Sequence, residues 1–257
     1  KYEPLTQSCV FRVAGKTPEL WDPETGRRFA IAHQTENDGR TRIQLEFDAA
    51  QSWFVVFRHK SSAPAGTPFA QFHELKSLDI PWTVRFDPDW GSDKEHSFSK
   101  LTDWSKAKDP LVRYYSGTAS YRSTFQLDKV PDEPVFLDLG RVEVVARVLL
   151  NGKDLGISWK PPHRFATGDA LKAGENTLEI EIANTWVNRL VGDEHLPLDA
   201  NWKDWKTLLG WPDWFPDVNK RPSGRYTFTT ARHYDKTSKL QPSGLLGPVR
   251  IMTSGDE

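Results

Sequence analysis

Hydrophobic and polar side chains alternate along two central stretches of the chain, residues 136–150 and residues 177–184. Successive side chains of a strand point to opposite sides, so the second stretch places one aliphatic set on a single face: Leu178, Ile180 and Ile182. Asn151-Gly152 follows the first stretch, and this pair tolerates the positive φ angles of a tight hairpin. The pattern predicts consecutive antiparallel strands in an all-β sandwich.

Short extended runs also fill the N-terminal part of the chain. They cover residues 10–13, 40–47 and 53–57, and turn-forming clusters lie between them at residues 22–26 and 37–39. Residues 53–57 are apolar throughout, which is typical of a central strand. This region is predicted to form a small β-sandwich.

Periodicity is lost at residues 61–66, which are rich in small residues and proline, as expected of a linker. We therefore predict a small β-sandwich domain at residues 1–62, a linker at 63–77 and a larger jelly-roll domain at 78–257. Further strands are predicted in the larger domain at residues 82–86, 119–127, 225–230 and 249–252, with residues 242–248 as a turn.

The chain contains eleven tryptophans, several of them clustered between residues 202 and 215. Trp202, Trp205 and Leu209 have helical spacing, so a short helix ending at Gly210 is expected, within a long surface loop. Three further tryptophans lie in or beside predicted strands and are expected in the core: Trp82, Trp104 and Trp186.

Charge and composition exclude several classes of partner. The formal net charge is −1, so nothing favours binding to nucleic acid or to an anionic membrane. Cys9 is the single cysteine, which excludes an internal disulfide. No apolar run is long enough to span a bilayer, and the chain starts at Lys1 without the apolar core of a signal peptide.

Several motifs together resemble known carbohydrate-active proteins. Residues 115–122, 137–140, 148–152, 176–180 and 243–249 resemble the galactose-binding-like jelly roll of family-2 glycosidases. Three more segments resemble the C-terminal region of glycoside hydrolase family 106, the α-L-rhamnosidases: residues 18–26, 188–194 and 222–228. The resemblance implies an accessory region next to a catalytic barrel, a carbohydrate partner and an extracellular or periplasmic location.

No catalytic residue is predicted in this chain. The resembled enzymes carry their catalytic carboxylates on a barrel, and a (β/α)₈ barrel needs about 250 residues of alternating strands and helices. Asp193 and Glu194 are adjacent and would point apart on an extended chain, whereas glycoside hydrolysis needs two facing carboxylates. Three histidines lack metal-ligand spacing and are expected on the surface or in loops: His163, His195 and His233.

No cofactor is predicted either. Four acids close together suggest a calcium loop: Asp87, Asp89, Asp93 and Glu95. An EF-hand needs a glycine and a terminal glutamate at fixed offsets that this loop lacks, so a solvated turn is the favoured interpretation. A structural calcium ion is indicated by no motif.

The aromatic loop supplies the candidate carbohydrate site. Sugar hydroxyls gain only about 0.5 to 1.5 kcal/mol per hydrogen bond over water, so a flat apolar ring has to add to the affinity. Trp211 and Trp214 lie in a segment broken by proline and are the candidate platforms. Five residues are candidate hydroxyl partners: Asn188, Arg189, Asp193, Asn219 and Arg225. Alternatively, the group from Asn188 to Asp193 forms a tight loop whose side chains satisfy their own backbone.

Two hypotheses of function follow. The first is a non-catalytic carbohydrate-binding region of an α-L-rhamnosidase-like hydrolase acting on plant or algal polysaccharide, a substrate class implied by the resemblance alone. The second is a structural domain that buttresses the catalytic barrel without binding free sugar. A large exposed aromatic patch would favour buttressing, whereas a cleft with polar groups around one ring would favour binding. A complete enzyme is the weakest alternative.

Overall fold

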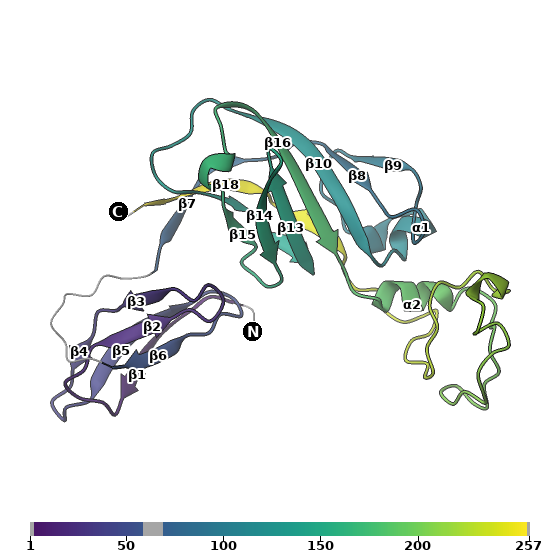
Figure 1. Ribbon diagram of the computed structural model, residues 1–257, viewed down its shortest axis with the longest axis horizontal. Coiled ribbons are helices and arrows are strands. Elements are labelled where there is room, and N and C mark those ends of the chain that lie inside the picture. The colour runs from purple at the N-terminus through teal and green to yellow at the C-terminus, as the bar shows by residue number, and fades with distance from the viewer. Residues whose placement is uncertain (1–2, 59–68, 256–257) are drawn as a thin grey trace.

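The computed structural model describes residues 3–58 and 69–255, and strands dominate it (Figure 1). The all-β fold expected from the alternating pattern is confirmed. None of its helices has the length and apolar character needed to cross a membrane.

The N-terminal unit is a small sandwich of two three-stranded antiparallel sheets. One sheet has the order β1-β5-β4 and the other β3-β2-β6: β1 (Leu5–Phe11), β5 (Thr41–Phe47), β4 (Gln34–Thr35), β3 (Arg28–Ala30), β2 (Pro18–Trp21) and β6 (Phe54–Phe57). Its core consists of Leu20, Ile31, Ile43 and Leu45. The small sandwich is therefore as expected.

Strand β6 was expected in the centre of a sheet, and this expectation is wrong. Among the described residues the strand pairs with β2 alone and so lies at an edge, and Phe54 is 61% exposed. A short apolar run does not distinguish a central strand from an edge strand whose aromatic side chains cover a small core.

The larger unit packs a six-stranded sheet against a four-stranded one. The six-stranded order is β14-β13-β16-β10-β8-β9, with β14 (Lys153–Ser158), β13 (Val145–Leu150), β16 (Gly174–Ala183), β10 (Thr118–Leu127), β8 (Trp82–Arg85) and β9 (Glu95–Phe98). The four-stranded order is β15-β11-β18-β7, with β15 (Arg164–Ala166), β11 (Val135–Asp138), β18 (Arg250–Gly255) and β7 (Gln71–Ser77). A two-stranded ladder joins β12 (Arg141–Glu143) to β17 (Gly244–Gly247), and three short helices lie at the periphery: η1 (Trp104–Lys106), α1 (Pro110–Arg113) and η2 (Gly168–Ala170).

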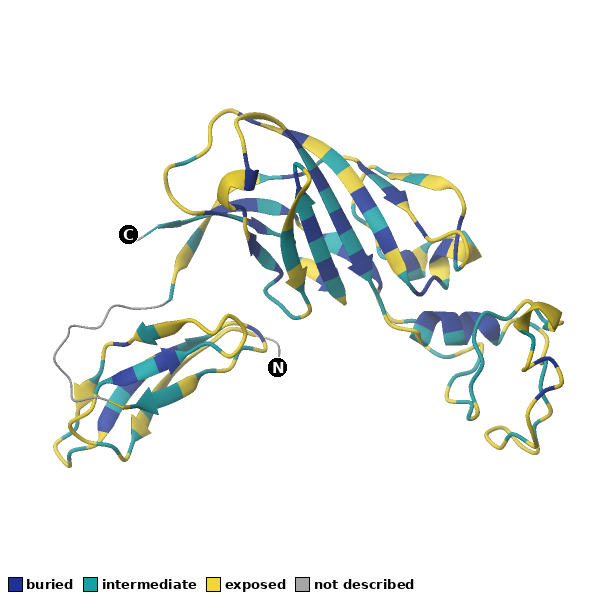
Figure 2. Cartoon of the chain, in the orientation of Figure 1, coloured by how far each residue is buried: buried dark blue, intermediate teal, exposed yellow. Residues whose placement is uncertain are grey.

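Burial follows the alternation along the central strands, as the dark and light residues of β16 and β10 show in Figure 2. Leu178, Ile180 and Ile182 are fully buried, which confirms the predicted core face. Trp82 and Trp104 are also in this core, as expected. Trp186 is 51% exposed, so its assignment to the core is wrong.

The predicted hairpin between β13 and β14 is confirmed. Asn151 and Gly152 have φ angles of 53° and 80°, which an Asn-Gly pair tolerates at low cost. The Asn151 side chain also donates to the Asn176 side chain at 2.7 Å and accepts from Thr177 N at 2.9 Å. The turn is thereby joined to the neighbouring strand β16.

The predicted linker at 63–77 differs from the structure in its second half. Residues 71–77 form β7, which pairs with β18. Because β7 is an edge strand and mostly exposed, its side chains are largely polar and give no alternating pattern. The first part of the linker lies outside the described residues, and the division into domains stays a prediction.

Residues 184–243, here called the lobe, project from one end of the larger unit between β16 and β17 (Figure 1). The lobe contains helix α2 (Val187–Asp193), the 3-10 helix η3 (Val218–Lys220) and otherwise irregular chain. The prediction of a helix near Trp202 is wrong. Lys203 N donates to Thr207 O instead and closes a loop there. The turn expected at residues 242–248 contains strand β17, and the strand expected at residues 225–230 is absent.

Candidate functional site

Helix α2 anchors the lobe to the larger unit. A Cβ atom at Gly192 would lie 2.6 Å from Tyr114 Cβ, so only glycine allows the helix to approach the end of α1 this closely. The Asn188 amide donates to Gln241 O at 2.7 Å and accepts from Gln241 N at 2.8 Å. These contacts fix the two ends of the lobe side by side.

Arg189 lies inside the lobe, only 4% exposed. Its Nη2 atom donates to Trp90 O at 2.9 Å, and the guanidinium lies 4.2 Å from the Tyr226 ring centroid. Burial lowers the pKa of Arg189 below its ordinary value, while the charge of Asp193 acts in the opposite direction. Arg189 Nε has no hydrogen-bond partner among the described residues.

Asp193, at the end of α2, explains why residues 225–230 form no strand. Its Oδ2 atom accepts from Tyr226 N at 3.0 Å, from Thr227 N at 2.7 Å and from the Thr227 hydroxyl at 2.7 Å. The backbone groups that a sheet would use are therefore bound by a carboxylate. Asp193 is 1% exposed, and its Oδ1 atom lacks a partner among the described residues.

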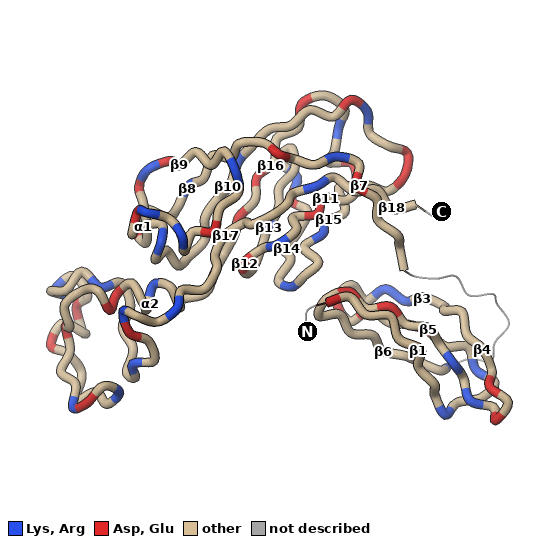
Figure 3. The backbone as a smooth tube through the Cα atoms, turned by 180° about the vertical axis from the view of Figure 1, so that it is seen from behind, with Lys and Arg blue, Asp and Glu red and all other residues tan. Residues whose placement is uncertain are grey.

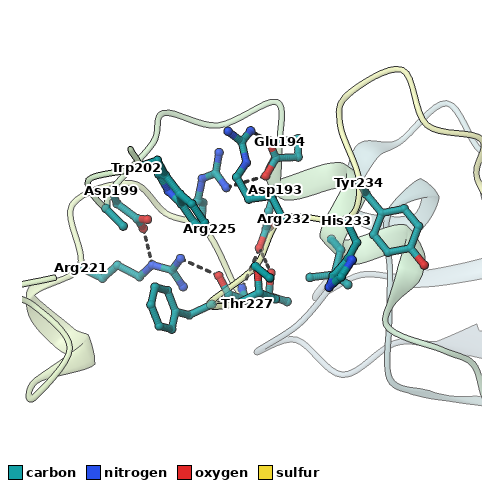
Figure 4. A pocket seen from close by; sticks show the side chains of 15 residues that line it. Asp193, Glu194, Asp199, Trp202, Arg221, Arg225, Thr227, Arg232, His233 and Tyr234 are labelled. Atoms are coloured by element: carbon teal, nitrogen blue, oxygen red, sulfur yellow. Dashed lines mark hydrogen bonds and ion pairs between the residues drawn. The ribbon is translucent and has the colours of Figure 1, made fainter. Parts of the chain in front are cut away.

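Ion pairs connect the rest of the lobe (Figure 4). Glu194 binds two arginines, Arg225 at 3.0 Å and Arg232 in close contact. Asp199 accepts from Arg221 Nε at 2.5 Å and from the Ser223 hydroxyl. Burial alone would raise the pKa of Asp199, but the hydrogen bonds from Arg221 and Ser223 outweigh it and hold that pKa below its usual range.

The two candidate platform rings differ in exposure. Trp214 is 7% exposed, donates from Nε1 to Asp199 O at 2.5 Å, and is covered by the Arg221 guanidinium at 4.4 Å. Trp211 is 63% exposed, and its ring packs against Phe215 with centroids 4.5 Å apart. Of these two rings, only that of Trp211 is therefore open to a ligand.

The candidate hydroxyl partners are mostly occupied by the chain itself. Asn188, Asp193 and Arg225 direct their polar groups to backbone or to opposite charges, which fits the alternative of a self-satisfied loop. Asn219 is exposed and its amide lies 3.3 Å from Asp217 Oδ1. The structure therefore does not gather these five residues around Trp211.

A hollow of about 800 Å³ does lie beside Trp211. Its wall includes the apolar residues Leu209, Pro212 and Trp214 and three exposed polar residues that the sequence analysis missed: Asn201, Asp213 and Lys220. They offer an amide, a carboxylate and an ammonium group around one open ring. No sequence signal could have identified them, because irregular chain brings them together.

Figure 3 shows basic and acidic residues interspersed along the described chain. Among the described residues, no group of three or more His, Cys, Asp or Glu side chains could hold a metal ion. The acids from Asp87 to Glu95 are exposed, and Glu95 pairs with Arg85 at 2.6 Å. The expectation of no cofactor stays a prediction.

The three histidines lie outside helices and strands, so their expected place in loops is confirmed, although His163 is not on the surface. His163 is 3% exposed and its Nδ1 atom lies 3.0 Å from the Ser158 hydroxyl, and burial lowers its pKa. His195 and His233 are exposed, as expected. His163 is thus a buried loop residue of the larger unit.

Two comparisons cover almost the whole chain. A "Putative beta-glucuronidase" of Formosa agariphila is 45% identical over 255 residues, which are 96% of this chain and 21% of that protein. A rhamnosidase structure from Novosphingobium sp. PP1Y is 35% identical, covers 98% of this chain and has a TM-score of 0.75. The chain spans about a fifth of the length of each relative, 21% and 22%.

A family match covers the centre of the chain. The family described as "Glycosyl hydrolase 2 galactose-binding domain-like" matches residues 94–224, from the larger unit into the lobe. This range contains β10 to β16 and most of the lobe, so the resemblance of the strand motifs to this family is confirmed. The chain belongs to the glycosyl hydrolase 2 galactose-binding-domain-like family.

Proposed function

We propose that this chain is a non-catalytic, carbohydrate-binding accessory region of a larger α-L-rhamnosidase-like glycoside hydrolase. The likeness to the Novosphingobium rhamnosidase supports the enzyme type, since it extends over 98% of the chain at 35% identity. The substrate in this proposal is a rhamnose-containing plant or algal polysaccharide, met outside the cell or in the periplasm. Catalysis belongs to a barrel elsewhere in the parent protein.

The observation that carries the proposal is the hollow beside Trp211. Its volume of about 800 Å³ lies within the usual range of about 300 to 1,000 Å³ for ligand sites. The open ring supplies apolar contact to a sugar face, and Asn201, Asp213 and Lys220 supply directional hydrogen bonds to hydroxyls. The buried ion pair of Asp199 with Arg221 holds the wall in place, so little ordering is needed on binding.

A glycan-array screen of the purified chain, followed by titration of Trp211→Ala, tests this proposal. Loss of the ring should weaken binding of the best ligand by about 1 to 3 kcal/mol. Trp159→Ala is the matched control, because Trp159 is 64% exposed against 63% for Trp211 but lies on the larger unit. Equal losses from both variants, or no glycan bound, would contradict the proposal.

A second candidate function is favoured by a separate observation. Large exposed apolar side chains gather in the lobe: Trp186, Leu198, Trp205, Leu209, Trp211, Phe215 and Val218. Such concentrations mark interaction surfaces, and the relatives are about five times longer than this chain, which covers 21% of one of them. The lobe would then buttress the barrel of the parent enzyme. Association of the chain with the purified barrel, together with no binding of any glycan on the array, would favour this role.

A further inference from the structure

The outer face of the β3-β2-β6 sheet, in the small N-terminal sandwich, carries a row of aromatic and basic side chains. Leu20 of β2 points into the core, so Glu19 and Trp21 on either side of it point outward. Strand pairing places Arg28 of β3 opposite Trp21 on one side and Phe54 of β6 opposite it on the other. Because directly opposite residues share a face, Arg28, Trp21 and Phe54 form one row across three strands.

The Trp21 ring in the middle of the row positions two guanidinium groups. Arg28 lies 4.3 Å and Arg58 lies 5.0 Å from the ring centroid. Arg58 also donates to a Glu19 carboxylate oxygen at 2.9 Å, and Trp21 Nε1 donates to the same oxygen at 2.8 Å. A cation over an aromatic ring is attracted by the ring electrons, so both guanidinium groups have a preferred place on this face.

Arg28 differs from Arg58 because its charge is not matched. Its side chain is exposed and makes no hydrogen bond or ion pair with any described residue. A guanidinium group presents its N–H donors in a planar fork that fits the paired oxygens of an oxyanion. The free donors of Arg28, already stacked on Trp21, are therefore suited to a carboxylate or sulfate group.

Phe54 supplies an apolar surface at the other end of the row. Its ring is 61% exposed, and it lies opposite Trp21 on the strand at the edge of the sheet. Neighbouring strands are about 4.8 Å apart, so the backbones at Arg28 and Phe54 are separated by roughly 10 Å. A single anion would contact only the Arg28 end, whereas an oligosaccharide with anionic groups has both the oxyanion and the apolar ring face that the row offers.

We propose that this face binds an anionic oligosaccharide, with a carboxylate or sulfate group on Arg28 and the apolar face of a sugar ring on Phe54. The face lies outside residues 94–224, which the family model matches, and in a different unit from the hollow beside Trp211. The inference therefore goes beyond the proposed function and does not depend on that hollow.

The test is calorimetric titration of the whole chain with three hexasaccharides: oligogalacturonate, O-sulfated rhamnan and unsulfated rhamnan. The first two distinguish a carboxylate from a sulfate as the anion, and at least one of them should bind. Arg28→Ala should weaken that binding roughly tenfold or more, the scale of losing hydrogen bonds to a charged group. Raising NaCl from about 50 to 200 mM should weaken it as well, because the contact is exposed.

The aromatic contact is tested in the same titrations. Phe54→Ala should weaken the anionic hexasaccharide by roughly three- to tenfold, and Phe54→Tyr, which retains a ring, should keep the affinity. Binding of unsulfated rhamnan should be unchanged in all of these variants. Since Arg28 and Phe54 are exposed, the thermal midpoints should also stay unchanged, which separates lost binding from unfolding.

The same unit contains matched controls. Arg12 is also exposed and makes no ion pair or ring contact with any described residue, and Leu5 is 55% exposed on β1 of the other sheet. Arg12→Ala and Leu5→Ala should leave the affinity unchanged. Losses equal to those of Arg28→Ala and Phe54→Ala would show general attraction to the unit and overturn the proposal.

The remaining outcomes separate the two proposals and the two kinds of ligand. If neither anionic hexasaccharide binds, or binding does not depend on Arg28, the anionic site is overturned whatever unsulfated rhamnan does. Arg28-dependent binding without any Trp211-dependent binding of unsulfated rhamnan would support this site and remove the hollow. Hexaglutamate has carboxylates but no sugar ring and should bind at least roughly tenfold more weakly. Equal affinity would assign the face to acidic peptides and overturn the proposal.

Discussion

The jelly-roll unit and the lobe are stabilised by different kinds of contact. Strands β10, β13 and β16 bury alternate side chains between two sheets, and Leu178, Ile180 and Ile182 have no exposed surface. The lobe has one short α-helix and one 3-10 helix, and hydrogen bonds and ion pairs of carboxylates, guanidinium groups and backbone amides hold it together. Apolar burial scales with area and hardly depends on pH, whereas buried charges depend on their partners and on protonation.

This difference bears on function. A sandwich of regular strands is rigid but offers mainly flat faces, while irregular chain can place aromatic rings and polar groups around a hollow. The lobe has this freedom because its chain does not form strand-to-strand backbone hydrogen bonds. Ion pairs and hydrogen bonds of charged side chains stabilise it instead. Variants that disturb one region and spare the other test the contrast directly.

The largest effect is expected from Ile180→Ala in the sandwich core. Removing three carbons from a fully buried position should lower the free energy of unfolding by about 2 to 5 kcal/mol. Urea denaturation followed by circular dichroism measures it. Ile157→Ala is the matched control, because Ile157 is 66% exposed on the neighbouring strand β14. Similar losses in both variants would contradict the assigned core.

The next effect is expected from Asp193→Ala, and it should be confined to the lobe. The variant removes the acceptor of the hydrogen bonds from Tyr226 N and Thr227 N, with a local loss of about 2 kcal/mol. Hydrogen exchange of these amides should accelerate, while exchange in β16 stays unchanged.

Asp213→Ala provides the control for Asp193→Ala, since Asp213 is exposed in the same lobe. Its exchange pattern should match that of the unaltered chain. Uniform acceleration throughout the sandwich in Asp193→Ala would show that the two regions unfold as one, against the contrast drawn here.

Acid should loosen the lobe before the sandwich. The pKa of Asp199 is depressed in the folded state, so its contribution to stability is present above the unfolded value of about 3.8 and is lost as pH falls through the folded pKa. Hydrogen exchange in residues 199–223 should therefore become faster below about pH 4. In Asp199→Asn this pH dependence should disappear. Simultaneous loss of protection in β10 and β16 would argue against separate behaviour.

The smallest effect is expected from Trp211→Ala on stability. Its ring is 63% exposed and contacts mainly Phe215 and Phe228, so the free energy of unfolding should fall by less than about 1 kcal/mol. Trp214→Ala, which removes a buried ring, should cost more, about 3 kcal/mol. Thermal melts of both variants decide which ring belongs to the structure of the lobe. The reverse order would remove Trp211 as a surface platform.

Predictions from local pattern succeeded mainly in the sandwich. The alternation of residues 177–184 identified the core face of β16, and Asn151-Gly152 identified the hairpin, because both depend on neighbouring residues alone. The edge strands were less well predicted. Strand β7 is too polar to show a pattern, and β6 is apolar without being central.

The sequence named Trp211 as a candidate platform, and the structure shows its ring exposed, but the residues around it were not predicted. Residues 225–230 have the alternation of a strand, yet Asp193, more than thirty residues away in sequence, binds their amides. Trp211 and Trp214 look equivalent in sequence, but Asp199 and Arg221 bury only the second. Asn201, Asp213 and Lys220 meet only because the loop folds back on itself.

The sequence by itself determined the strands of the sandwich, their buried faces and the tight turn, since side-chain alternation and φ preferences act between neighbours. Only the tertiary structure decided which rings are exposed, which carboxylates are bound by other groups of the chain, and where the hollows lie. Those properties depend on ion pairs and hydrogen bonds between residues far apart in sequence. The free energy of such contacts depends on how deeply they are buried, and the local sequence pattern does not reveal that burial.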